Sequence, residues 1–349
     1  MIKNSAILIL RSFSDEEVKQ FEDFLNSPFH NKNSKVIQLY ASLKNYHPGY
    51  DDESITKENL FSALYGNDKY KESLIRNLFS DLNILAEKFL QLIHVNNNYT
   101  YDKLLIEELN IRDINEVMGK KLKLFEKKVS SNKSRDQDYY MNKIFLHDMQ
   151  GFMSTDKTLT ESTRPVDIIN KIKLFLITVM ESYFQLIIEE QRVNIKHNYD
   201  FLKFILGYLK DHLKEFKDSP LLLIFYTLWL CFFEKDDEKY FLRSKELIAE
   251  NFSQLTIVDK KNIYAIIQTY CINKIDSGHS EYNRELLNVL LEMLKHNIVS
   301  HKKDLIHLNL YRNVLLLCIK LNEIDVLEKF IKDYISFIRE ESRETMYAY

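Results

Sequence analysis

The sequence predicts an all-α fold, and three observations support the prediction. Its 349 residues include only six glycines and four prolines, whereas average usage of about 7% would give roughly 24 glycines. Apolar residues recur at three- and four-residue steps through most of the chain, as they do along one face of a helix. No stretch is a convincing β-strand. We therefore expect long helices joined by short polar turns, with a compact helical unit first and an irregular array of helical hairpins after it.

The first part of the chain, residues 1–96, is predicted to form a compact N-terminal helical domain. In "SDEEVKQFEDFLNSP", Ser14 and Glu17 form a capping box and acidic residues occupy the first turn. Further along, leucines at three- and four-residue steps predict one long helix. The expected helices are the one that begins after Ser14, 34–46, 56–66, and a fourth that contains residues 74–92.

A cluster of asparagines in "NNNYTYD" marks the predicted end of this domain. The next segment, residues 97–160, is expected to hold connecting helices near 101–130 and 136–153 and a polar loop, "STDKTLTESTRP". Residues 161–349 are predicted to form helical repeats. Their helices are expected at 166–192, 198–216, 220–234, 238–250, 258–275, 281–297, 303–321 and 324–340.

The stretch "YRNVLLLCIKLNEIDVLEKFIKDY", from Tyr311 to Tyr334, is typical of a helical hairpin. It carries one apolar stripe on each side of its polar junction, made of Tyr311, Val314, Leu315 and Cys318, then Leu327, Ile331 and Tyr334. These offsets and the junction "KLNEID" resemble a tetratricopeptide repeat, a helix-turn-helix unit of about 34 residues. The resemblance implies a tetratricopeptide-like α-solenoid. Large residues stand where that family has small ones, so the helix spacing is expected to differ from the family's.

Two earlier segments repeat the hairpin pattern less regularly, the first around Trp229 and the second around Tyr270. The whole chain, with its "FLNSPFHNK" beginning, is also similar to a group of uncharacterised bacterial helical-repeat proteins, a likeness that implies no biochemical function. After Glu341 the chain runs "SRETMYAY", which resembles the start of another helix. We therefore expect the natural array to continue past Tyr349.

Several kinds of chemistry are excluded or disfavoured by the sequence. The glycines lie too far apart for a dinucleotide fingerprint, a phosphate-binding loop or a GxSxG elbow. The ten histidines include no HxxxH pair and the three cysteines no CxxC pair, so we expect no metal site. No catalytic residue and no cofactor is predicted. An enzyme whose site is assembled from distant residues stays an alternative.

The charge and hydropathy of the chain set limits on its partners. A net charge of −3 is spread over 48 basic and 51 acidic residues, so no global field favours nucleic acid or an anionic membrane. The longest apolar run, "LLLIFYTLWLCFF", is shorter than the roughly 18 residues that span a bilayer. The cysteine pattern fits a reducing compartment. We expect a cytoplasmic protein without membrane insertion.

One basic run, "KKLKLFEKKVSSNKSR", is a candidate patch for nucleic acid or for an acidic protein surface. The alternative is a solvated helix face and loop. A second alternative site is the segment around Gly66, which could be a helix-turn-helix with Lys69, Lys71 and Arg76 facing DNA, or an ordinary hairpin. The cations of the basic run are Lys120, Lys121, Lys123, Lys127, Lys128, Lys133 and Arg135.

The tetratricopeptide resemblance also implies a partner-binding groove, lined by the first helix of each hairpin. Three further offsets, Leu230, Leu316 and Ile319, are apolar and are either covered by packing or part of a partner site. The predicted function is therefore non-enzymatic: a scaffold or adaptor that binds a peptide or helix of a protein partner, with a nucleic-acid-binding regulator as the alternative. The groove positions are Tyr226, Tyr264, Gln268, Asn309, Arg312 and Lys320.

Overall fold

The computed structural model describes residues 4–96, 99–153, 157–193, 195–234, 237–298 and 306–338. In these ranges every regular element is a helix, which confirms the all-α prediction. The chain divides into two compact units, Met1–Ile114 and Asn115–Tyr349, and the division falls inside the segment that the sequence assigns to connecting helices. No helix in the described ranges has the length and apolar character required to cross a lipid bilayer.

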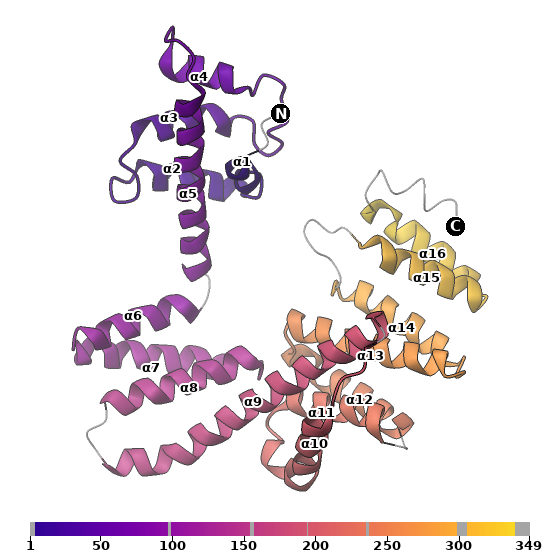
Figure 1. The fold of residues 1–349 in the computed structure, drawn as a ribbon. Coiled ribbons are helices and arrows are strands. Elements are labelled where there is room, and N and C mark those ends of the chain that lie inside the picture. Colours follow the sequence, from indigo (N-terminus) through magenta and orange to yellow (C-terminus); the bar gives the residue numbers. More distant parts are fainter. Residues whose placement is uncertain are drawn as a thin grey trace. The chain divides into compact units, whose positions relative to one another are not determined.

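The first unit is organised around one long helix. Helices α1, α2, α3 and α4 all contact α5, as the upper part of Figure 1 shows, and α6 also contacts α5. The sequence patterns left α1 unassigned and located α2, α3, α4 and α5. The helices are α1 (Ser5–Leu10), α2 (Asp15–Asn26), α3 (Ser34–Lys44), α4 (Lys57–Tyr65), α5 (Glu72–Asn96) and α6 (Tyr99–Ile111).

Aromatic rings fill the core of the first unit. The ring of Phe21 lies 5.3 Å from that of Phe13, 5.0 Å from that of Tyr40 and 5.1 Å from that of Phe89, so α2, α3 and α5 meet at one residue. The predicted capping box starts α2: the Glu17 amide donates to Ser14 Oγ, and the Ser14 amide donates to the Glu17 carboxylate. The cap fixes where α2 begins and therefore which of its faces reaches the core.

The second unit begins with four helices that pack in chain order. Helix α7 contacts α8, α8 contacts α9, and α9 contacts α10, α11 and α13. Within 101–130 the structure therefore has two helices, α6 and α7, separated by a turn at Asp113, where φ is 55°. The helices are α7 (Asn115–Ser131), α8 (Gln137–Met153), α9 (Lys157–Val193) and α10 (Asp200–His212).

Three hairpins follow, and we call them the array. Each hairpin packs two consecutive helices, and α11 contacts α13 while α14 contacts α15, so each hairpin is covered by the next. This stacking is solenoid-like. The helices are α11 (Pro220–Phe233), α12 (Asp237–Asn251), α13 (Ile257–Asp276), α14 (Tyr282–Lys295), α15 (Leu308–Lys320) and α16 (Ile324–Tyr334).

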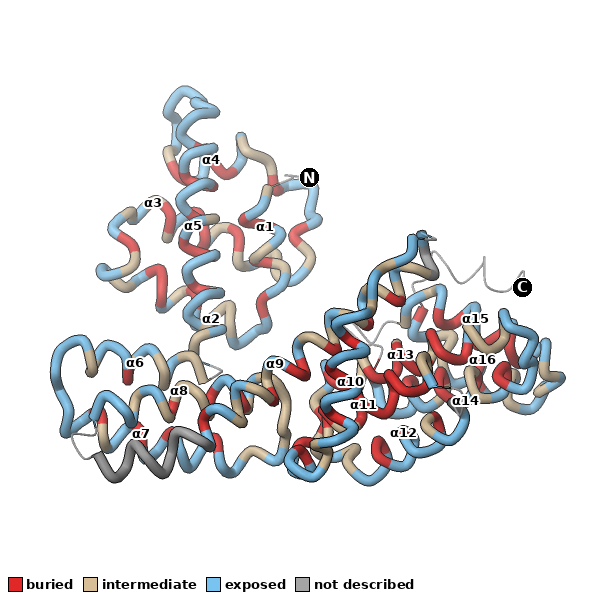
Figure 2. The backbone as a smooth tube through the Cα atoms, turned by 60° about the horizontal axis from the view of Figure 1, so that its bottom comes forward, coloured by how far each residue is buried: buried red, intermediate tan, exposed pale blue. Residues whose placement is uncertain are grey.

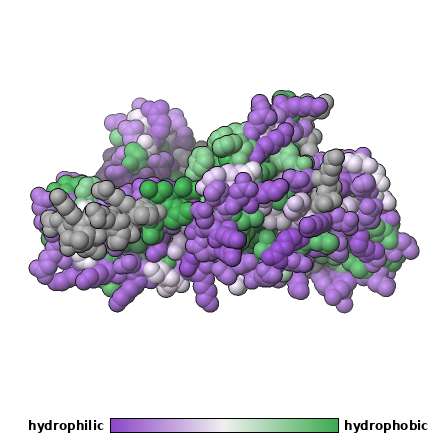
Figure 3. All heavy atoms as spheres, turned by 90° about the horizontal axis from the view of Figure 1, so that it is seen from below, coloured by the Kyte–Doolittle hydropathy of each residue, from purple (hydrophilic) through white to green (hydrophobic). Residues whose placement is uncertain are grey.

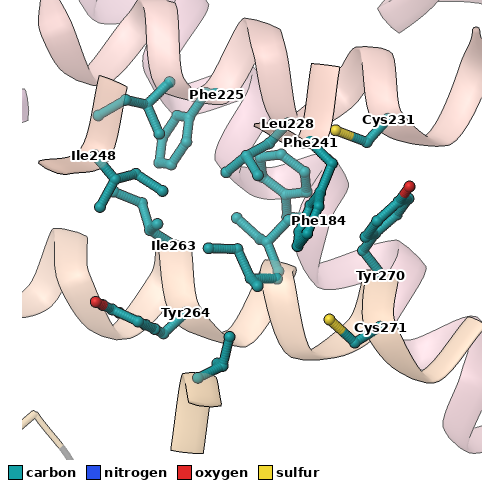
Figure 4. Packing of buried hydrophobic residues seen from close by; sticks show 14 of the residues in the cluster. Phe184, Phe225, Leu228, Cys231, Phe241, Ile248, Ile263, Tyr264, Tyr270 and Cys271 are labelled. Carbon is teal, nitrogen blue, oxygen red and sulfur yellow. The ribbon is translucent and has the colours of Figure 1, made fainter. Parts of the chain in front are cut away.

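Helix α11 is buried along nearly its whole length, unlike its amphipathic neighbours (Figure 2). Trp229, the only tryptophan, stacks on Phe184 of α9 with ring centroids 4.1 Å apart, and its indole N–H donates to the Met180 carbonyl at 3.2 Å. Figure 4 shows side chains of α11 and α13 meeting in this core, with Cys231 and Cys271 as small buried members. Hence a run that is too short to span a bilayer serves as the centre of the second unit.

Among the described residues, four helices end with the same pattern of hydrogen bonds, and three of these ends have no glycine at the left-handed position. Asp113, Asn297 and Asn322 have φ of 55°, 50° and 55°, and Gly278 has 95°. After each, an amide donates back across the helix end, as from Glu323 to the Cys318 carbonyl at 2.9 Å. This is a Schellman cap, which needs a left-handed residue. Asparagine and aspartate tolerate that conformation, so the low glycine content is compatible with many tight turns.

Candidate functional site

The exposed face of α15 gathers several of the predicted groove positions. Three of them lie on this face together with two apolar residues whose placement the sequence left open. Leu316 is 46% exposed and Ile319 is 49% exposed, although the opposite side of the helix, which includes Tyr311 and Val314, is buried. Neither cation of this face forms an ion pair with a described residue. We call this face the α15 stripe: Asn309, Arg312, Leu316, Ile319 and Lys320.

A second feature is a hollow of about 510 Å³ among α12, α13 and α14. Its lining is mainly apolar and also includes charged groups. Two of its lining residues, Phe252 and His296, have ring centroids 4.5 Å apart, and Lys260 Nζ lies 4.0 Å from the centre of the Phe252 ring. The hollow is lined by Lys245, Ile248, Ala249, Phe252, Tyr264, Ile267, Glu285, Asn288, Val289, Glu292 and His296.

Hydrogen bonds and an ion pair fix the polar groups of this hollow. The Tyr264 hydroxyl donates to Glu292 Oε2 at 3.1 Å, and Lys245 Nζ lies 2.7 Å from Glu285 Oε2. Burial, and then the neighbouring Glu292 carboxylate, raise the pKa of Tyr264 above its ordinary value, so its hydroxyl keeps its proton. The hollow thus offers apolar contact and fixed hydrogen-bond partners, and has no ionised tyrosine.

The other predicted groove residues on α11 and α13 are largely covered. Tyr226 is buried, and burial raises its pKa, with Tyr240 and Glu234 as the next causes. Gln268 is half-buried, and its amide approaches Met293 Sδ of α14 at 3.1 Å. Leu230 is also buried. The structure thus brings Tyr264 and Gln268 together against α14, and it places the α15 residues on a separate, open face.

The predicted basic run lies on the outer face of α7 and in the turn after it. Lys121, Lys123 and Lys127 are exposed, while Met118, Leu122, Phe125 and Val129 of the same helix are buried. Lys120 pairs with Glu116 at 2.6 Å. Lys128 and Lys133 are exposed, and Arg135 folds back on its own turn, donating to the Asn132 carbonyl and lying 4.1 Å from the Tyr139 ring. The run is an amphipathic helix with a cationic outer face.

The possible helix-turn-helix around Gly66 is the pair α4 and α5 with its connecting turn. Lys69 and Lys71 lie in the turn, Arg76 lies on α5, and all three are exposed. The neighbouring Glu72 pairs with Lys57 at 2.7 Å, which places a carboxylate among these cations. Like-charged phosphate would be repelled by that group.

The cysteines are poorly suited to nucleophilic chemistry. Burial raises the pKa of the Cys271 thiol to about 12 and also raises the pKa of Cys318. A thiol with a pKa this high stays protonated at neutral pH, and the thiolate is the reactive form. These residues therefore act as small core side chains.

Comparison of the chain with protein-family models, with curated proteins and with solved structures finds no match in any of the three. Sequence patterns missed most of the hollow, because its lining comes from the second helices α12 and α14 and the tetratricopeptide offsets point to the first helix of each hairpin. No sequence signal could have found it, because the Lys245–Glu285 ion pair joins residues 40 positions apart.

Proposed function

We propose that this protein is a non-enzymatic scaffold or adaptor that binds a helix or peptide of a protein partner in the cytoplasm. The array would act as a tetratricopeptide-like solenoid, in which stacked hairpins present an extended surface rather than a deep catalytic cleft. Its regular elements are suited to this role because binding side chains lie on rigid helices.

The observation that carries the proposal is the α15 stripe. Leu316 and Ile319 leave about half of their area in water on a helix whose other face is fully used in the core. Arg312 and Lys320 flank them without an ion-pair partner among the described residues. An apolar strip with cations beside it fits an amphipathic helix that carries acidic residues next to its apolar anchors.

The experiment is an affinity pull-down from the source organism's soluble lysate at moderate salt, with and without nuclease, read by mass spectrometry. Wild type is compared with an R312E/K320E double variant and with a matched K121E/K123E variant on α7. We expect a protein partner that survives nuclease, is lost from the α15 variant and is kept by the α7 variant. Circular dichroism of all three chains should be equal, because every changed residue is exposed.

If the α15 substitutions leave the recovery of the protein partner unchanged, the α15 stripe is not its binding site. Recovery that collapses with nuclease would favour the second candidate function, a nucleic-acid-binding regulator. The cationic outer face of α7 supports that alternative, since several lysines there are exposed. Contacts to phosphate release counterions, so binding of that kind would weaken steeply with added salt and would be lost from the α7 variant.

A further inference from the structure

A cluster of metal-ligating side chains lies in the second unit, away from the α15 stripe and the hollow. His147 and Asp148 are consecutive on α8, and Asp167 lies on α9, which packs against α8. One ligand atom from each of the three residues lies within 4.8 Å of the other two. The sequence predicted a polar loop over residues 154–165, but α9 begins at Lys157. His147 and Asp167 lie on different helices, so no short sequence spacing indicates the cluster.

Asp167 is the buried member of the cluster. It is 7% exposed, and its Oδ1 atom is fully buried without a hydrogen-bond partner among the described residues. This oxygen lies 3.7 Å from His147 Nδ1, which is longer than a hydrogen bond. A buried carboxylate oxygen without a donor is unfavourable unless a cation or proton meets it there.

Lys171 supplies a positive charge to the cluster in this structure. Its ammonium lies 2.6 Å from Asp167 Oδ2 and 3.8 Å from Asp148 Oδ1. Two carboxylates and one ammonium leave one negative charge in the cluster that no described cation balances. The lysine side chain is 50% exposed, so it can turn outward into water when a stronger cation enters. It does not reach the buried oxygen that faces His147.

We propose that His147, Asp148 and Asp167 form a binding site for a zinc-like divalent ion, which fastens α8 to α9 when it displaces Lys171. In a tetrahedral zinc site with bonds of about 2.1 Å, ligand atoms lie about 3.4 Å apart, close to the separation of His147 Nδ1 and Asp167 Oδ1. Water would complete the coordination. Imidazole together with carboxylate favours zinc and similar transition-metal ions over magnesium and calcium, which prefer oxygen ligands alone.

The test is isothermal titration of the full chain, stripped with chelator, with Zn²⁺, Co²⁺ and Mg²⁺ at neutral pH. We expect about one equivalent of Zn²⁺, a visible Co²⁺ spectrum of tetrahedral type, and no Mg²⁺ binding at the same concentrations. Asp148→Asn, at an exposed position, should weaken Zn²⁺ binding about tenfold or more without unfolding the chain. His147→Ala and Asp167→Asn should abolish the Co²⁺ spectrum, with circular dichroism checking that the fold is kept.

Two further variants separate a metal site from an ordinary ion-pair cluster. Lys171→Met removes the competing ammonium, so it should raise Zn²⁺ affinity several-fold. His212→Ala is the matched control, because His212 lies 2.9 Å from Glu215 and neither is part of this cluster. The proposal is overturned if wild type takes up no Zn²⁺, or if the His212 variant loses as much affinity as the His147 variant. It is also overturned if Lys171→Met leaves the affinity unchanged or lowers it.

Discussion

The N-terminal unit and the array bury their helices in different ways. In the first unit, α5 is the common partner of α1, α2, α3, α4 and α6, so residues far apart in sequence meet on one helix. In the array, most contacts join helices that follow one another or lie two apart. The comparison teaches that local periodicity is enough to predict stacked hairpins, whereas a shared central helix requires knowledge of long-range contacts.

The largest expected effect tests whether the two units unfold separately. Phe225→Ala leaves a cavity in the core of the array, where the Phe225 ring lies 5.5 Å from the Phe184 ring. It should lower the free energy of unfolding of the second unit by about 3–5 kcal/mol. Phe21→Ala should cost the first unit a similar amount. Urea unfolding followed by the fluorescence of Trp229, the only tryptophan, reports the second unit alone.

We therefore expect Phe225→Ala to lower the fluorescence midpoint and Phe21→Ala to leave it unchanged while circular dichroism shows an earlier loss of helix. If Phe21→Ala moves the fluorescence midpoint by as much as Phe225→Ala does, the two units unfold as one cooperative structure, which contradicts separate unfolding.

A second prediction concerns pH, to which the units should respond with opposite sign. In the second unit, burial raises the pKa of Asp136, Glu181 and Asp259, and Asp259 adds to the effect on Glu181. The folded state then holds more protons than the unfolded state above about pH 4, so stability rises as pH is lowered from 7 through these raised pKa values. In the first unit, hydrogen bonds from Ser54 and Lys57 lower the pKa of Asp52 and Glu72.

The stabilising contribution of Asp52 and Glu72 is present above about pH 4 and is lost as the pH falls through their lowered pKa values. Urea midpoints between pH 7 and 4 should therefore rise when followed by Trp229 fluorescence, which reports the second unit. Glu181→Gln should flatten this rise, because one of its causes is removed. A fluorescence midpoint that falls steadily from pH 7, in wild type and variant alike, would contradict the assignment.

The smallest expected effects come from the turns. Asn322→Gly relieves a left-handed residue in the last hairpin and should raise stability by about 0.5–1 kcal/mol. Gly66 in the first unit has φ 64° and ψ −127°, a conformation that only glycine adopts without strain. Gly66→Ala should therefore lower the free energy of unfolding by about 1–2 kcal/mol. Thermal unfolding of both variants checks the signs. If Asn322→Gly lowers stability and Gly66→Ala raises it, contacts with neighbouring residues, and not backbone preference, determine the stability of these turns.

Much of the array could be predicted from local patterns. The stripe from Tyr311 to Cys318 is buried as expected, and the junction at Asn322 is the turn between α15 and α16. The helix-opening cap at Ser14 was equally readable, because its hydrogen bonds join residues only three positions apart. These features depend on spacing within a few turns, which the sequence contains in full.

The candidate site was less accessible from the sequence. Leu230 and Leu316 occupy equivalent offsets, yet one is buried and the other is half exposed, because α11 is enclosed by α9, α12 and α13. The hydroxyl of Tyr264 reaches Glu292, which lies 28 positions further along the chain. The cluster of His147 and Asp167 similarly depends on how α8 meets α9. Such contacts are set by packing between helices, and the periodicity of the sequence does not predict that packing. The expectation for residues 342–349 lies outside the described residues.

The enclosure of α11 also has a consequence for synthesis of the chain. The ribosome releases α11 before α12 and α13, the helices that later cover it. About 40 residues separate the end of α11 from the end of α13, a delay of roughly 2–8 s at usual elongation rates. During that interval, a helix that is apolar on nearly all sides has only the earlier helices to cover it. Nascent chains in which α11 has left the ribosome and α13 has not should therefore be strong clients for holding chaperones, and chains in which α13 has also emerged should be weak ones.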